Sequence, residues 1–324
     1  PIVPMGVDRT SPPGHPGQGR PGVASTLLAV LVLAGCGPDS DGAAIGDPSN
    51  GMYTGLADLP DSIRLTDGRW EGEPVAPGGA SRPSVHMVPS FRVNGDLAMD
   101  GVPDTVIALA VNFGGSGEFL YAVVLRSQET AWSQEALLAL GDRVQLRGGR
   151  IGNGALYLDL VEAGPGDAAC CPGDVVTRGW RPDADGTLAP FDPGIPSSRL
   201  SWATLQGSRW VLRSWGGNDP VDPEMKLTLD AGPGRASGDS GCNRFSQSVQ
   251  DGAAPGEIEF GAAAGTRKAC PDPLMTIERR YLGQLAQVKK LGFLGGRLAL
   301  SYQTAEGWDQ MVFEPSGAVE SAGN

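Results

Sequence analysis

The chain has 324 residues, of which 40% are hydrophobic, and it contains 49 Gly and 27 Pro. This length allows two domains with separate cores, and the Gly and Pro content favours a strand-rich, loop-rich fold over a helical bundle. The formal net charge is −12 and the isoelectric point is about 4.6, so no basic face is available for phosphate contacts. We therefore expect a mainly β protein with two β-rich modules and no nucleic-acid partner.

An apolar segment near the start of the chain predicts an export signal. Arg20 precedes Val23 to Ala34, a mostly apolar run of 12 residues that is shorter than the roughly 20 needed to cross a bilayer. Its end, LAGC (Leu33 to Cys36), resembles the lipobox of bacterial lipoproteins, which implies lipid attachment to the Cys36 thiol and cleavage before it. Residues 1–35 are thus predicted to be a signal peptide, with its true start left open, and residues 36–50 a lipidated tether.

A lipid anchor would hold the mature protein in the cell envelope. Each buried lipid methylene contributes about 0.8 kcal/mol, so two or three acyl chains make membrane attachment almost permanent. Gly37, rather than Asp, follows Cys36. This favours the outer membrane, facing the periplasm, in a Gram-negative cell, and otherwise the outer face of the cell membrane is expected. Later apolar stretches are all far shorter than about 18 residues, so an anchored rather than spanning protein is expected.

The region 51–180 alternates short apolar runs with turn signals and is expected to be one β-rich module. TVIALAVNF and FLYAVVL flank Gly114–Gly117, and RVQLRGG and ALYLDLVEAG flank Gly152–Gly154. These spacings predict two antiparallel hairpins, and the apolar run Val106–Val111 predicts a strand buried on both faces. Gly114–Gly117 lacks the Lys and Ser/Thr of a phosphate-binding loop, so a hairpin turn is preferred. The Pro- and Gly-rich stretch 181–204 is expected to be a linker.

The segment GDLAMDGVPD raises the question of a metal site. Asp96, Asp100 and Asp104 occupy positions 1, 5 and 9 of a calcium-loop spacing. Position 3 is Ala98 and position 12 is Ile107, so two of the expected oxygen ligands are missing. The loop has two interpretations: a solvated acidic turn, which is preferred, and a calcium site. If the loop is a calcium site, the alternative function is that of a calcium-dependent adhesion or ligand-binding module.

Four motifs of this region occur in a recognisable order. They are GDLxxDGxxD at 95–104, NxGGSGxF at 112–119, LGDRV at 140–144 and CCP at 170–172. This order resembles a module of uncharacterised bacterial envelope lipoproteins, over about residues 51–180. The resemblance implies an envelope protein and carries no known activity.

The second patterned region, residues 205–316, contains five ordered motifs. Their matching positions are Gly207 and Trp210, then Gly241, Cys242, Asn243 and Arg244, then Thr266, Arg267 and Cys270, then Glu278, and finally Phe313 and Pro315. Together they resemble the META domain, also called the HslJ-like domain. The resemblance implies a compact antiparallel β-structure with a single helix, and a stress-related role such as heat induction or drug tolerance. Residues 317–324 are expected to be a tail.

One amphipathic helix is predicted inside this region from the residues themselves. Asp272 and Pro273 form a helix start. The apolar face consists of Leu274, Ile277, Tyr281, Leu285 and Val288, and the predicted end is marked by Lys289 and Lys290 in the last turn and Gly292 beyond it. We expect this helix to lie against strands such as KLTLD and LALSY.

The cysteine count predicts disulfides, since four of the five cysteines remain once Cys36 is lipidated. Of the three connectivities, only Cys170 with Cys171 and Cys242 with Cys270 keeps each bond within one module. By chain entropy the second bridge would stabilise its domain by roughly 3.5 kcal/mol. A bond between adjacent cysteines is unusual, so Cys170 and Cys171 are expected either to pair or to stay reduced.

Catalytic patterns are weak. Ser240 in GDSG resembles a serine-protease nucleophile, but His86 belongs to the other module and lacks the accompanying His motif. Most Trp residues, including Trp210 and Trp308, are expected in cores, whereas Trp215 is the one most expected on the surface as a contact residue. We therefore expect a non-enzymatic envelope protein with a binding, structural or stress-related role, with an unknown envelope protein or small ligand as partner, no cofactor, and a hydrolase as the least favoured alternative.

Overall fold

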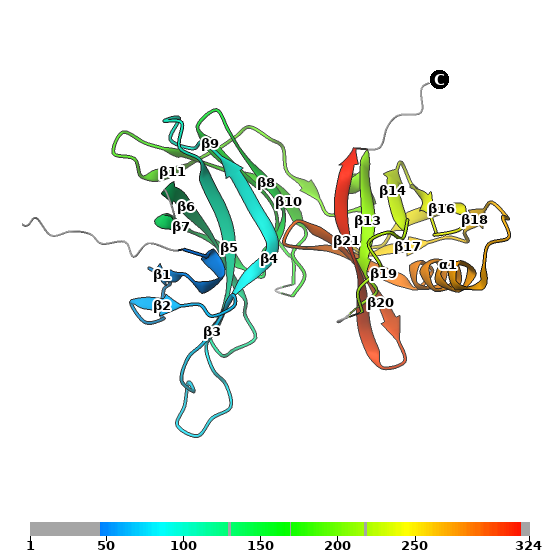
Figure 1. Cartoon of the computed structure of the whole chain (residues 1–324), viewed down its shortest axis with the longest axis horizontal. Coiled ribbons are helices and arrows are strands. Elements are labelled where there is room, and N and C mark those ends of the chain that lie inside the picture. The colour runs from blue at the N-terminus through cyan, green and yellow to red at the C-terminus, as the bar shows by residue number, and fades with distance from the viewer. Residues whose placement is uncertain (1–45, 129–130, 169, 217–218, 319–324) are drawn as a thin grey trace, which may run out of the picture. The chain divides into compact units, whose positions relative to one another are not determined.

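A computed structural model describes residues 46–128, 131–168, 170–216 and 219–318. The predicted signal peptide and the lipidation site Cys36 lie outside the described residues. Within them the protein is mainly β, with 21 strands, one α-helix and two short 3-10 helices (Figure 1). The mainly β fold class predicted from the sequence is therefore confirmed. None of the helices in these ranges is long and apolar enough to cross a membrane.

The first region contains a hairpin and two five-stranded antiparallel sheets. The hairpin is formed by β1 (Met52–Thr54) and β2 (Ser62–Arg64). The first sheet has the order β3 (Arg69–Glu71), β4 (Ser84–Gly95), β5 (Asp104–Asn112), β6 (Phe119–Gln128) and β7 (Ala131–Asp142). The second has the order β11 (Leu188–Phe191), β10 (Asp174–Pro182), β9 (Ala155–Glu162) and β8 (Gln145–Gly152), with β12 (Ser198–Arg199) also paired to β10.

Strand β5 is central to the first sheet and is buried on both faces. Val106 and Ala108 belong to a core shared with the second sheet. Ile107 and Leu109 belong to a separate core with Tyr53 of the β1–β2 hairpin. Because successive side chains of a strand point to opposite faces, each side of β5 meets its own apolar layer. The burial predicted from the apolar run in this strand is confirmed.

Both predicted hairpins are confirmed. Strands β5 and β6 pair with Val111 opposite Phe119, and β8 pairs with β9 around the predicted Gly-Asn-Gly turn. In the turn between β5 and β6, the Asn112 Nδ2 donates to the carbonyl oxygens of Gly115 and Gly117, at 3.1 and 2.9 Å. The glycine-rich segment is therefore a turn held by an asparagine side chain.

The end of the stretch expected to be a tether, residues 46–50, belongs to the described structure. Pro48–Asn50 form a 3-10 helix, η1, and the Asp47 Oδ1 accepts a hydrogen bond from the Ser49 N–H at 3.0 Å. The Tyr53 hydroxyl donates to the Pro48 carbonyl at 2.6 Å. These bonds attach the end of the expected tether to the folded region.

The stretch 181–204 is more ordered than expected of a linker. It contains β11, β12 and most of a second 3-10 helix, η2 (Trp202–Leu205). The Asp183 N–H donates to the Thr187 carbonyl at 2.9 Å, which closes a turn between β10 and β11. Phe191 then packs edge-on against Tyr157 at 5.7 Å between ring centroids. The Asp and Gly residues of the stretch thus form a hairpin turn.

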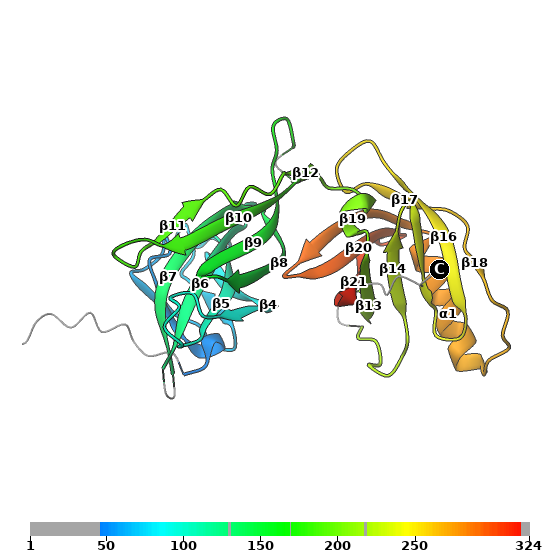
Figure 2. The ribbon, with the colours of Figure 1, turned by 90° about the horizontal axis from the view of Figure 1, so that it is seen from above.

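The second region is one nine-stranded antiparallel sheet. Its order is β17 (Ile258–Phe260), β16 (Arg244–Asp251), β15 (Arg235–Asp239), β14 (Thr228–Gly232), β13 (Ser208–Ser214), β21 (Gly307–Ala318), β20 (Arg297–Thr304) and β19 (Val288–Leu294), with β18 (Ala264–Gly265) beside β16. The two end strands approach each other, since Glu257 forms a bridge with Lys290 and the Leu291 N–H donates to the Gly256 carbonyl at 2.8 Å. The sheet is therefore nearly closed into a barrel (Figure 2).

Helix α1 (Asp272–Leu285) is the single α-helix of the described residues. It starts at the predicted position and buries Tyr281 and Leu285. Its predicted end was wrong: Val288, Lys289 and Lys290 lie in β19, and Gly292 is also a strand residue. The Ala286 N–H closes the last helical turn on the Leu282 carbonyl. The following residues pair with β20 instead, and the Val288 and Leu291 side chains enter the core of the second region.

Candidate functional site

The three aspartates of the proposed calcium loop are directed to the loop's own backbone. The Asp96 carboxylate accepts hydrogen bonds from the N–H groups of Asp100 and Gly101, at 3.1 and 2.8 Å. Asp100 pairs with the Arg126 guanidinium. Asp104 is 2% exposed and its Oδ2 accepts from the Leu97 N–H at 2.8 Å. Burial raises the pKa of Asp104 above its usual value, against the opposing effect of hydrogen bonds from backbone N–H groups of the loop.

These carboxylates do not form a cation site. Within the described ranges, no group of three or more His, Cys, Asp or Glu side chains is placed to hold a metal ion. Calcium needs six to eight oxygen ligands converging on one point. Here Asp96 stabilises the loop and Asp100 forms an ion pair, so the structure does not bring the predicted ligands together.

The signature turn of the second region is built around a half-buried carboxylate. Glu278 of α1 receives hydrogen bonds through its Oε2 from the Ser240 hydroxyl at 2.9 Å and the Asn243 N–H at 3.0 Å. Its Oε1 receives a third from the Asn243 Nδ2 at 3.2 Å. Ser240 is fully buried and Asn243 is 4% exposed. The helix is therefore tied to the turn between β15 and β16 by bonds to a charged group, which are among the stronger hydrogen bonds in proteins.

Asn243 also joins this turn to the loop that precedes α1. Its Oδ1 accepts from the Lys268 N–H at 2.8 Å and from the Thr266 hydroxyl at 2.7 Å. A disulfide between Cys242 and Cys270, with Cα atoms 6.1 Å apart, links the same two segments. The motif residues noted in the sequence thus meet at one place, where they connect helix, turn and loop.

Ser240 and His86 do not form a nucleophile and base. The Ser240 hydroxyl lies 2.7 Å from the Asn243 carbonyl oxygen and is enclosed by the turn. His86 lies on β4, between Arg69 and Ala110 of the neighbouring strands. A general base must lie within hydrogen-bond reach of the proton it removes. Glu278, the carboxylate beside Ser240, is already occupied by three donors of the turn.

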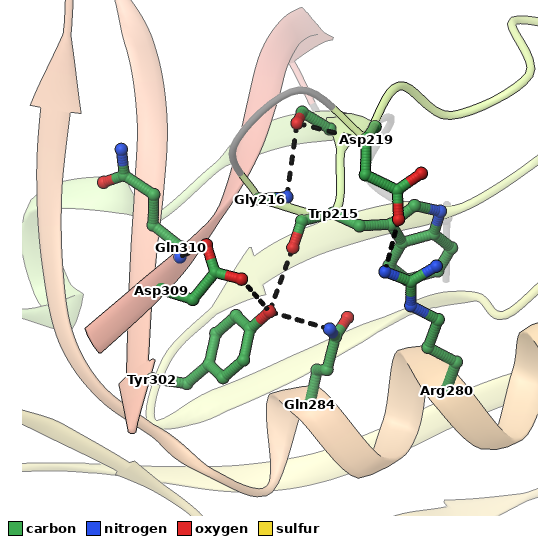
Figure 3. Close-up of polar contacts among 9 residues, drawn as sticks. Trp215, Gly216, Asp219, Arg280, Gln284, Tyr302, Asp309 and Gln310 are labelled. Atoms are coloured by element: carbon green, nitrogen blue, oxygen red, sulfur yellow. Dashed lines mark hydrogen bonds and ion pairs between the residues drawn. The ribbon is translucent and has the colours of Figure 1, made fainter. Parts of the chain in front are cut away.

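A second polar cluster lies beside the C-terminal half of α1 (Figure 3). The Tyr302 hydroxyl is 2.8 Å from the donating Gln284 Nε2, 3.0 Å from the Trp215 carbonyl and 3.1 Å from the Asp309 Oδ2. The Gln310 N–H donates to the Asp309 Oδ1 at 2.8 Å. Burial, followed by the hydrogen bond with Asp309, raises the pKa of Tyr302 to about 12. The phenol therefore stays protonated and acts as a structural donor at neutral pH.

Trp215 is buried, contrary to its predicted exposure. It is 6% exposed and lies edge-on to Tyr281, with ring centroids 6.3 Å apart. The Arg280 guanidinium covers the indole at 4.5 Å from the ring centroid and pairs with Asp219 at 2.6 Å (Figure 3). The prediction for Trp308 was wrong in the opposite direction, since it is 57% exposed. Trp215 directly follows β13 and is covered by Arg280 of α1, whereas Trp308 lies near the start of β21 and stays largely exposed.

Cys170 and Cys171 are free thiols in the loop between β9 and β10. Cys170 is exposed, and its hydrogen bond with Cys171 raises the pKa of the Cys171 thiol. The loop is held at its base by Arg199, which pairs with both Asp167 and Asp174. Of the two states expected for these cysteines, the structure has the reduced one.

Sequence patterns did not indicate the cluster around Tyr302. Tyr302 and Asp309 are ordinary strand residues whose relation appears only once β20 and β21 pair. The turn signal between them, Thr304 to Gly307, could have indicated that Tyr302 and Asp309 meet, because a hairpin places residues on either side of its turn opposite each other.

The comparison with family models concerns this second region. The family model of the META domain matches residues 203–315. Among solved structures, the NMR structure of a protein from Burkholderia xenovorans is similar at 25% identity, covering 40% of this chain and 97% of that chain, with a TM-score of 0.28. No curated protein matches the chain. With its motif residues gathered at one turn and a nearly closed sheet carrying one helix, residues 203–315 are a META domain.

Proposed function

We propose that this protein is a non-enzymatic, lipid-anchored envelope protein whose folded body serves a binding, structural or stress-related role outside the membrane. The observation that carries the proposal is the order of segments at the start of the chain. A short apolar run ends in LAGC at Cys36, and Asp47, eleven residues later, caps the 3-10 helix η1 of the folded region. This arrangement suits a lipid anchor followed by a short tether of Gly, Asp and Ser residues.

The geometry of the META domain supports a role without turnover. Its polar side chains are hydrogen-bonded to one another at the Glu278 turn and at Tyr302, in positions that connect elements of the fold. Ser240, which carries the hydrolase alternative, is buried and has no histidine beside it within the described residues. A nucleophile needs both access to substrate and an activating base.

Intact mass spectrometry of the full chain from bacterial membranes tests the anchor. We expect a species that begins at Cys36 and carries acyl mass. Cys36→Ala should abolish both processing and acylation, whereas the control Cys170→Ala should change the mass only by the substitution. An unprocessed, unacylated chain in the membrane-free fraction would overturn the envelope assignment.

Activity assays on peptides, esters and glycans test the non-enzymatic role. We expect no turnover by the purified protein above that of Ser240→Ala and His86→Ala variants. Turnover that one of these substitutions removes would contradict the proposal, because it would require a catalytic site that uses the substituted residue.

A further inference from the structure

The first region contains a cleft of about 450 Å³ that none of the predicted sites uses. We name it the β7 cleft. It is lined by the 96–103 loop through Leu97 and Ala98, by Asp104 of β5, by Val124 and Arg126 of β6, by Glu135 to Leu138 of β7, and by Pro182 and Asp185 to Leu188 of the β10–β11 hairpin. This volume lies within the range of small-molecule sites.

The walls of the β7 cleft are partly apolar. Leu97 and Val124 are buried members of the core between the two sheets, and Leu138 and Leu188 pack against that core. The cleft therefore opens directly onto the apolar layer of the module. A ligand that entered it would bury apolar surface, which contributes about 25 cal/mol per Å² removed from water.

The polar groups of the cleft have one predominant charge. Three carboxylates line it, from Asp104, Glu135 and Asp185, against the single guanidinium of Arg126. That guanidinium is already paired with Asp100 at the rim. The field inside the cleft is therefore negative, and the apolar part of the walls strengthens it because it lowers the local dielectric.

Asp104 is the unusual member of this set. Its residue is 2% exposed, and in the described part of the chain no Lys or Arg side chain pairs with it. Its hydrogen bonds come from loop N–H groups, although Arg126 is its direct neighbour across the β5–β6 ladder. Buried carboxylates are normally paired with a cation. Among the described residues no cationic side chain therefore neutralises the Asp104 carboxylate. A positively charged ligand in the cleft would neutralise it.

We propose that the β7 cleft binds a small organic cation, an ammonium group attached to an apolar body. The ammonium would lie toward Asp104 and Glu135, and the apolar body would contact Leu138 and Leu188. The site depends on the binding role proposed above and is independent of the lipid anchor.

Calorimetry with three matched probes tests this ligand class on the purified full chain. Tryptamine, tryptophol and indole-3-propionate share an indole body and differ in carrying a cationic, neutral or anionic end. We expect saturable binding of tryptamine, binding of tryptophol at least tenfold weaker, and no binding of indole-3-propionate. Equal affinity for all three probes, or no binding of tryptamine at 10 mM, would overturn the proposal.

Two substitutions and a control locate the binding. Ala98→Trp, at an exposed position on the cleft wall, should fill the cleft and abolish tryptamine binding without altering the core. Glu135→Gln should weaken tryptamine binding about three- to tenfold, whereas Glu73→Gln, at a carboxylate that is 97% exposed and outside the cleft, should leave it unchanged. Unaltered binding in both cleft variants would refute the site. Cys36→Ala should abolish acylation and leave tryptamine binding intact, which separates failure of this inference from failure of the anchor proposal.

Discussion

Tyr302 and Asp309 lie directly opposite each other on β20 and β21, with the phenol oxygen 3.1 Å from the Asp309 Oδ2. The same hydroxyl contacts the Trp215 carbonyl and receives a hydrogen bond from Gln284 of α1. One side chain therefore joins two strands, the segment after β13 and the helix. This makes Tyr302 a test of how far polar contacts stabilise the META domain.

Tyr302→Phe should lower the free energy of unfolding by about 1–3 kcal/mol at pH 7, because it leaves buried and half-buried polar partners without this hydrogen bond. Urea unfolding followed by circular dichroism measures this change. Tyr157→Phe, at a half-buried tyrosine on β9, is the matched control and should cost much less. An equal loss in both variants would contradict the structural role given to the Tyr302 hydroxyl.

The difference between wild type and Tyr302→Phe should shrink with rising pH. The folded-state pKa of Tyr302 is about 12, above the ordinary value of 10. Ionisation therefore favours the unfolded chain between these two values, and the wild type loses the contribution of this group as the pH rises through that window. Tyr302→Phe has no such group. Repeating the urea series from pH 9 upward checks the sign, and a difference that grows with pH would be inconsistent with the raised pKa.

Glu278→Gln should destabilise the META domain by about 1.5–3 kcal/mol, since the carboxylate accepts three hydrogen bonds and an amide nitrogen cannot accept any of them. Thermal and urea unfolding measure the loss. Glu306→Gln, in the exposed turn between β20 and β21, is the control for removing one negative charge. If the two variants are equally stable, the signature turn does not depend on the Glu278 carboxylate.

Gln247→Met should stabilise the protein by about 1–2 kcal/mol. Gln247 is 3% exposed on the core-facing side of β16, and neither amide atom of its side chain has a hydrogen-bond partner among the described residues. Replacing an unsatisfied buried amide with an apolar side chain of similar volume removes its desolvation cost. The urea midpoint measures the effect. Gln250→Met, at an exposed site on the same strand, should be close to neutral, and a destabilised Gln247→Met would indicate that the amide is hydrogen-bonded in solution.

Alkylation should distinguish the two cysteine pairs. Without reduction we expect iodoacetamide to label Cys170 and Cys171, and after reduction also Cys242 and Cys270. Because the thiolate is the reactive form and the pKa of Cys171 is raised, its labelling should be slow at pH 8 and accelerate above pH 9. Peptide mapping by mass spectrometry measures both rates. Labelling of all four residues only after reduction would show that the adjacent cysteines pair with each other.

Calcium at millimolar concentration should leave the unfolding midpoint unchanged, since Asp96 and Asp100 are already bonded within the loop and to Arg126. Differential scanning calorimetry with and without calcium checks this. A rise in the midpoint that disappears in Asp100→Ala would restore the calcium interpretation of the loop.

Local patterns determined much of the architecture. The Gly-rich turns and apolar runs were sufficient to locate the β5–β6 and β8–β9 hairpins, because turn chemistry and strand alternation act over a few residues. The Asp272–Pro273 pair likewise located the start of α1, since proline is favoured in the first helical turn. The end of α1 was beyond such reasoning. Val288 continues the helical apolar spacing, and it is a strand residue because it pairs with Tyr302 of β20.

The sequence by itself determined the fold class, the META motifs and the alternation that buries β5. Tertiary structure alone decided which polar residues meet. Glu278 lies 35 residues from Asn243, and Tyr302 contacts a carbonyl 87 residues away. Tertiary structure also places Arg280 over Trp215. It likewise brings Asp104 and Glu135 together around one cleft. Such contacts depend on how strands and helix pack in three dimensions, and spacing along the chain carries no information about them.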